Sequence, residues 1–80
     1  MDEYFIIKAT LNDKKNKEVN FVSKKKFNYK IVDRNFKGVY IMLYKEDVYK
    51  LIDKNKIIDI DVNRISYYEY LCFKNIVPSI

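Results

Sequence analysis

Residues 4–11 read Tyr-Phe-Ile-Ile-Lys-Ala-Thr-Leu, and every second side chain from Phe5 to Leu11 is apolar. Alternation at every second position is typical of a β-strand with one buried face. Residues 12–17 are polar and predict a turn, and residues 18–23 alternate again. The two alternating stretches therefore predict a β-hairpin at the start of the chain.

The middle of the chain continues in extended segments. Residues 26–33 alternate and predict a third strand, either separate or continuous with the second through a bulge. Residues 34–38 predict a turn, because Gly38 can adopt a positive φ. Residues 39–44 are almost continuously apolar, which predicts a central strand.

A change of period follows. Tyr44, Val48 and Ile52 recur at helical spacing and predict a helix over about residues 46–55. Residues 57–62 predict another strand, with Ile58, Ile60 and Val62 inward and the aspartates between them outward. Residues 64–73 fit a strand or a helix, and their tyrosines and phenylalanine favour the strand.

Together these elements predict one α+β domain over residues 1–80. It consists of a small, mostly antiparallel sheet or open barrel of five to six short strands. One helix, about residues 46–55, comes before the last two strands. The residues after 74 are expected to be partly ordered, because their apolar side chains would otherwise be exposed.

Several kinds of chemistry lack the residues that they require. The sequence contains no histidine, one glycine and one cysteine, Cys72, which is expected to be a buried apolar side chain. A zinc site, a phosphate-binding loop and the most common general base are therefore not predicted. Asp59 and Asp61 could together bind Mg²⁺, but a solvated strand face is the preferred interpretation. We predict a protein that is not an enzyme, with no catalytic residue, no metal and no cofactor.

The cellular compartment follows by elimination. A single cysteine cannot form an internal disulfide, whereas small secreted domains usually contain several. No signal-peptide pattern is present, and no apolar run approaches the ~20 residues of a membrane span. A cytoplasmic location without a membrane partner is expected.

The formal net charge is +5, and most of the excess lies in the predicted hairpin and the segment after it. Such a cluster can attract nucleic acid or an acidic protein surface. Lysine, asparagine, isoleucine, tyrosine and phenylalanine make up more than half of the chain, so AT-rich codon usage offers a second explanation. The candidate basic residues are Lys14, Lys15, Lys17, Lys24, Lys25, Lys26 and Lys30.

A second candidate surface is aromatic. On the predicted strands, large amphipathic side chains share the face away from the main core, and they are exposed unless the helix covers them. Tyrosine and methionine are common in protein interfaces, so this face predicts a partner-binding or homodimer surface. Its residues are Tyr40, Met42, Tyr44, Tyr68 and Tyr70.

In composition the chain resembles small accessory proteins of AT-rich phages and mobile elements, which often act as stoichiometric inhibitors of host machinery. That resemblance implies an inhibitor or adaptor that binds another protein, for example one with an acidic or nucleic-acid-binding surface. The alternative is a basic RNA- or DNA-binding module that uses the hairpin from Lys14 to Lys30.

Overall fold

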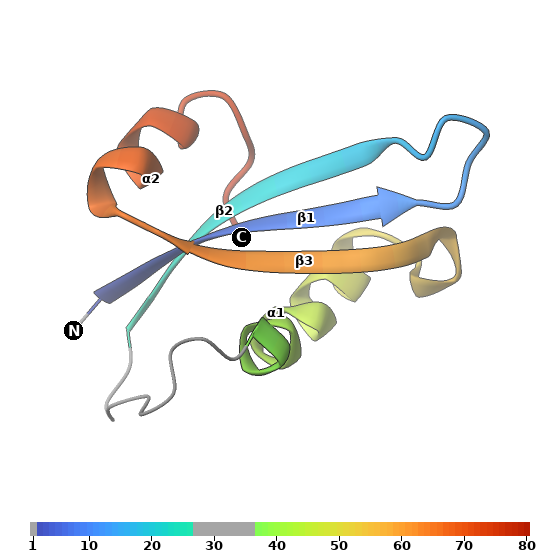
Figure 1. Cartoon of the computed structure of the whole chain (residues 1–80), viewed down its shortest axis with the longest axis horizontal. Helices are drawn as coiled ribbons and strands as arrows, with labels where there is room; N and C mark the ends of the chain where they lie inside the picture. Colours follow the sequence, from blue (N-terminus) through green and yellow to red (C-terminus); the bar gives the residue numbers. More distant parts are fainter. Residues whose placement is uncertain (1, 27–36) are drawn as a thin grey trace.

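The computed structural model describes residues 2–26 and 37–80. It shows an α+β fold in which a three-stranded antiparallel sheet lies between two helices (Figure 1). The elements in chain order are β1 (Asp2–Leu11), β2 (Glu18–Lys26), α1 (Lys37–Leu51), the 3-10 helix η1 (Lys54–Lys56), β3 (Ile57–Ile65) and α2 (Tyr67–Phe73).

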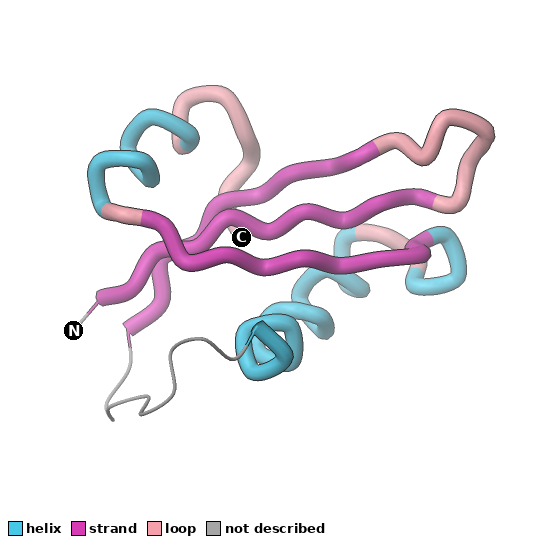
Figure 2. Tube along the Cα trace, in the orientation of Figure 1, coloured by secondary structure: helices cyan, strands magenta, loops and turns pink. Residues whose placement is uncertain are grey.

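The strand order is β2-β1-β3, so the first strand of the chain is the central one (Figure 2). The predicted hairpin and its polar turn are confirmed, with Ile7 opposite Phe21 in the register. In the turn, the Asp13 carboxylate accepts hydrogen bonds from the backbone N–H groups of Lys15 and Lys17, both at 3.0 Å. Asn16 takes a positive φ of 46°, which asparagine tolerates better than most residues.

The face of the sheet that carries Phe5, Ile7 and Ala9 packs against α1, and we call it the α1 face. All three side chains are fully buried. The Phe5 ring lies 5.1 Å from the Tyr40 ring and 5.2 Å from the Tyr44 ring, centroid to centroid. The helix is held to the sheet mainly by this aromatic contact and the apolar residues around it.

The opposite face, which carries Tyr4 and Ile6, is covered at one end by α2, and we call it the α2 face. The Tyr4 ring lies 5.2 Å from the Tyr67 ring and 4.9 Å from the Tyr70 ring. Successive residues of a strand point to opposite faces, so the contacts of Tyr4 and Phe5 place the two helices on opposite sides of the sheet. Figure 1 shows the same arrangement.

The last residues of the chain return to the sheet and pair with β2. The Val22 N–H donates to the Pro78 carbonyl, and the Val22 carbonyl accepts from the Ile80 N–H, both at 2.9 Å. The backbone groups of Val22 therefore point away from β1. The expected ordering of this tail is confirmed, and it partly covers the outer edge of β2.

The predicted α+β class and antiparallel sheet are confirmed, but the described residues form three strands, not five to six, and their sheet does not close into a barrel. Residues 39–44 lie in α1 and not in a central strand, so the helix extends from Lys37 to Leu51 where about 46–55 was predicted. It precedes one strand, not two. Gly38 lies in the first turn of α1 and has no positive φ. Most of the strand predicted over residues 26–33 lies outside the described residues.

The strand predicted over residues 57–62 is confirmed as β3, which runs on to Ile65. The strand predicted over residues 64–73 is wrong beyond that point, because Tyr67–Phe73 form α2. Ser66 caps α2: its hydroxyl accepts from the Glu69 N–H, and the Glu69 carboxylate accepts from the Ser66 N–H, both at 3.1 Å. This reciprocal capping stabilises a helix that tyrosine propensity alone would not favour.

Replacing Ser66 with alanine is expected to lower the free energy of unfolding by about 1 kcal/mol, because the Glu69 N–H loses its acceptor. Urea denaturation followed by circular dichroism measures this loss. Ser79→Ala serves as the control, since Ser79 is an exposed serine outside any helix. Equal stability of the Ser66→Ala variant and the wild type would contradict the capping role.

Candidate functional site

The outer edge of β3 is an unpaired strand edge in the described part of the chain. Ile6 pairs with Val22 on one side and with Asn63 on the other. Because Val22 points its backbone groups away from β1, Ile6 and Asn63 form a hydrogen-bonded pair in the antiparallel ladder. The alternation along β3 then directs the N–H and C=O groups of Ile60 and Val62 outward, where no segment of residues 2–26 or 37–80 pairs with them.

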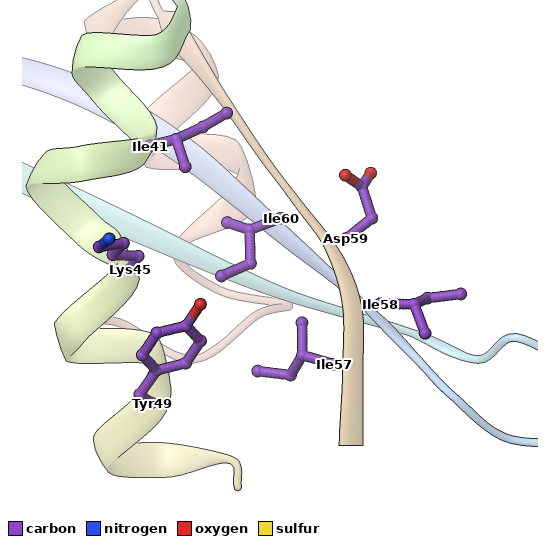
Figure 3. Close-up of a pocket in the computed structure, with 7 residues that line it drawn as sticks. All are labelled: Ile41, Lys45, Tyr49, Ile57, Ile58, Asp59 and Ile60. Carbon is purple, nitrogen blue, oxygen red and sulfur yellow. The ribbon is translucent and has the colours of Figure 1, made fainter. Parts of the chain in front are cut away.

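A groove of about 310 Å³ lies beside this edge, between α1 and β3. In Figure 3 the side chains of Ile57 and Ile60 point from β3 toward α1, and that of Asp59 points away from it. On the α1 side the wall is formed by Ile41, Lys45 and Tyr49, which are four residues apart and therefore lie on one stripe of the helix. The groove residues are Ile41, Lys45, Tyr49, Ile57, Ile58, Asp59 and Ile60.

Two large apolar side chains near the groove are exposed. Ile58 is 55% exposed, because a bulge between Thr10 and Leu11 shifts the register and leaves Ile58 without a partner on β1. The prediction that Ile58 points inward is therefore wrong. Met42 is 71% exposed and lies three residues before Lys45 on α1, next to the groove. Ile58 belongs to the lining of the groove, although its side chain points away from α1 in Figure 3.

Acidic side chains lie on the other face of the same edge. Asp59 is opposite Thr10 and Asp61 is opposite Lys8, so both aspartates project from the α2 face. The Asp61 carboxylate accepts a hydrogen bond of 2.9 Å from the Asn63 side chain. Asp59 is exposed, and its carboxylate has no hydrogen bond or ion pair with any residue that the structure describes. Toward α1 the lining of the edge is apolar apart from Lys45, and the opposite face of the edge is acidic.

The structure does not bring the predicted lysines into one patch. Lys14, Lys15 and Lys17 lie in the turn between β1 and β2, whereas Lys24, Lys25 and Lys26 lie at the far end of β2. At about 3.3 Å per residue, Lys17 and Lys24 are roughly 23 Å apart. Asp2 and Glu3 lie opposite Lys26 and Lys25 and reduce the positive charge there. Lys30 lies outside the described residues.

The five predicted interface residues are also separated. Tyr40 and Tyr44 lie in the core under the α1 face, with 3% and 1% of their surface exposed. Tyr70 is half-buried against Tyr4, and Tyr68 is 76% exposed on α2, on the opposite side of the sheet. Only Met42 lies next to the groove.

A cluster of polar side chains is buried at the end of the sheet where α1 begins. The Glu3 carboxylate is 3.3 Å from the Arg64 guanidinium, and its Oε2 has no hydrogen-bond partner among the described residues. The Lys25 ammonium lies 5.1 Å from the centroid of the Tyr44 ring. The charges of Glu3 and Arg64 compensate each other, and Lys25 lies opposite Glu3 in the strand register.

The pKa of the Tyr44 phenol is raised from 10.0 to about 12, mainly by burial and also by the charges of Asp47 and Glu3, while the Ser23 hydroxyl acts to lower it. Ser23 does not reach hydrogen-bonding geometry with the Tyr44 hydroxyl, which has no partner in residues 2–26 or 37–80. The phenol therefore stays protonated near neutral pH.

Between pH 10 and 12, the folded protein retains a proton on Tyr44 that the unfolded chain releases. The free energy of unfolding is thus expected to fall as the pH rises through this range, and to fall less steeply in Tyr44→Phe. Urea denaturation at several pH values measures the slope. Tyr68→Phe, at an exposed position, should keep the wild-type slope, and an unchanged slope in Tyr44→Phe would contradict the prediction.

The described residues show no arrangement of carboxylates and cysteine that resembles a metal site. Residues 2–26 and 37–80 contain no group of three or more aspartate, glutamate or cysteine side chains arranged to hold a metal ion. Cys72 is exposed on α2, so the prediction that it is buried is wrong. None of the helices in the described residues combines the length and the apolar content needed to cross a membrane.

The groove itself was not predicted from the sequence. The only part of the sequence that could have indicated the groove is the isoleucine-rich stretch from Ile57 to Ile60. This stretch predicts a strand, but the pattern gives no information on whether the strand lies at an edge of the sheet. Comparison with family models, with curated proteins and with solved structures finds no match to this chain.

Proposed function

We propose that this chain is a non-enzymatic binding protein that recognises another protein through the groove between α1 and β3. The observation that carries the proposal is the combination of an unpaired strand edge with an apolar groove beside it. Exposed apolar side chains next to a concave surface are typical of protein interfaces. An inhibitor or an adaptor would both act through such a surface.

Nucleic-acid binding receives less support from the arrangement of charges. A single strand of nucleic acid is usually bound by a continuous basic groove with aromatic side chains beside it. Here the candidate lysines that the structure describes form two groups at opposite ends of β2, and acidic residues lie opposite one of them. The groove between α1 and β3 is lined by one basic residue, Lys45, and one acidic residue, Asp59, so it is not a basic groove either.

Ile58→Asp is expected to abolish partner binding, because it places a charge on the exposed apolar rim of the groove without disturbing the core. The wild type and the variant, each carrying the same affinity tag, are incubated with extract of the source cells, and the retained proteins are quantified by mass spectrometry. A partner retained by the wild type should fall at least tenfold with Ile58→Asp.

Ile76→Asp is the matched control, since Ile76 is an exposed isoleucine in the segment after α2. It should retain the partner at the wild-type level. Circular dichroism establishes that both variants are folded. If Ile58→Asp retains every partner, or if only Ile76→Asp loses it, the groove is not the binding site.

A further inference from the structure

We propose that the outer edge of β3 binds an extended segment of the partner as an additional β-strand. Apolar side chains of that segment enter the groove between α1 and β3, and basic side chains lie beside Asp59 and Asp61. The inference rests on the proposed function, because it names the kind of segment that the same groove receives.

The backbone is the first line of support. The N–H and C=O groups of Ile60 and Val62 point outward from β3, which gives an incoming strand a ladder of hydrogen bonds. Proteins usually cover or block such edges. In this sheet the β2 edge pairs with the chain's own residues at Val22, whereas no described residue covers the β3 edge.

The two faces of the β3 edge differ in a way that suits the alternating side chains of an added strand. A strand paired with β3 lies about 4.8 Å from it, and its side chains alternate between the two faces of the sheet. On the α1 face they meet the groove, where Ile41, Tyr49 and Ile60 present apolar surface (Figure 3). On the α2 face they meet Asp59. The recognised segment therefore alternates between apolar and other residues.

Charge complementarity favours basic residues at the alternate positions. The Asp59 carboxylate is exposed and has no partner among the described residues, and Asp61 projects from the same face. Opposite charges on directly paired strands stabilise one register over others. A lysine or arginine beside Asp59 would thus set the position of the incoming strand.

A second copy of this chain fits the edge less well. An antiparallel copy paired through β3 would place its own α1 on the same face of the sheet. Neighbouring strands are about 4.8 Å apart, whereas packed helices need about 8–10 Å between their axes. Helix α1 lies against β3 and makes fewer contacts with the other strands, so the two helices would overlap. An extended segment brings no helix with it.

The test uses random ten-residue linear peptides displayed on phage and selected against the full chain. Enriched peptides should alternate apolar residues with lysine or arginine. One of them is synthesised, and its affinity is measured by fluorescence anisotropy. Binding should weaken at least tenfold with Asp59→Lys and less than twofold with Glu46→Lys, which makes the same charge change at an exposed site on α1.

The decisive measurement changes the peptide and leaves the protein intact. Methylating the peptide N–H groups that face β3 should reduce binding at least tenfold, and methylating the alternate N–H groups should not. Equal effects of the two methylations, or enriched peptides without alternation, would overturn strand addition. So would a dimer of the free chain that dissociates in the Ile60→Pro variant, since the occupant would then be a second copy.

The experiments distinguish failure of strand addition from failure of the proposed protein-binding function. If Ile58→Asp removes the cellular partner but neither methylated peptide loses affinity, the groove binds protein by another geometry and only strand addition is wrong. If the partner persists with Ile58→Asp, the proposed function itself fails.

Discussion

Replacing Phe5 with alanine is expected to lower the free energy of unfolding by about 3–5 kcal/mol. The Phe5 side chain is fully buried at the centre of the α1 face and contacts the rings of both Tyr40 and Tyr44. Alanine would remove these ring contacts and leave a cavity between β1 and α1. Domains of this length have total stabilities of roughly 4–12 kcal/mol, so the substitution would remove a large part of the stability.

Urea denaturation followed by circular dichroism measures the change, and binding of a hydrophobic dye reports on the loosened core. Phe73→Ala makes the same substitution at a half-buried position at the end of α2 and should cost much less. Similar losses for the two variants would show that the contact between β1 and α1 does not dominate the stability.

Arg64→Ala is expected to lower the free energy of unfolding by about 1–3 kcal/mol, since it leaves the buried Glu3 carboxylate without its nearest cation. The two groups are 3.3 Å apart, and the Glu3 side chain is only 9% exposed. The lower part of the range is expected if Lys25, which lies opposite Glu3, compensates for the loss. The Arg64 side chain is 35% exposed, so water also screens the pair.

A double-mutant cycle with Glu3→Gln isolates the pair, because Arg64→Ala should cost less once the carboxylate is gone. The exposed pair between Lys8 and Glu18, at 3.8 Å, provides the comparison. Glu18→Gln should change the stability by less than about 1 kcal/mol. Additive effects of Glu3→Gln and Arg64→Ala would contradict the coupling.

The hairpin could be predicted from the sequence because its signals are local. Alternation over residues 4–11 and 18–23 sets both strands, and the polar run between them sets the turn. The strand of residues 57–62 follows from the same alternation. In each case a single period fits the segment and no other structure competes with it.

Helix α1 was missed in its first half for a physical reason. Residues 39–44 are almost all apolar, and a short continuous apolar run fits a buried strand and a buried helix equally well. The contacts of Tyr40 and Tyr44 with Phe5, far away in sequence, favour the helix. Helix α2 was also missed, because residues 64–73 were predicted as a strand, although Ser66 and Glu69 have the spacing of a capping box that indicates a helix.

The candidate site depends on topology, which the sequence does not state. Ile57 to Ile60 form a binding edge only because β3 pairs with β1 on the side away from β2. A strand order with β3 in the middle would bury the same residues. The predicted aromatic and lysine clusters separated because their members lie on different faces or at opposite ends of the sheet.

The central position of β1 also has a consequence for the order of events during synthesis. The hairpin partner of β1 follows it directly, but its other partner ends at Ile65, 39 residues after Lys26. At about 5–20 residues per second, the ribosome needs roughly 2–8 s to make that stretch. During this interval a nascent hairpin would present the second edge of β1, with its apolar face uncovered, to chaperones and to neighbouring nascent chains.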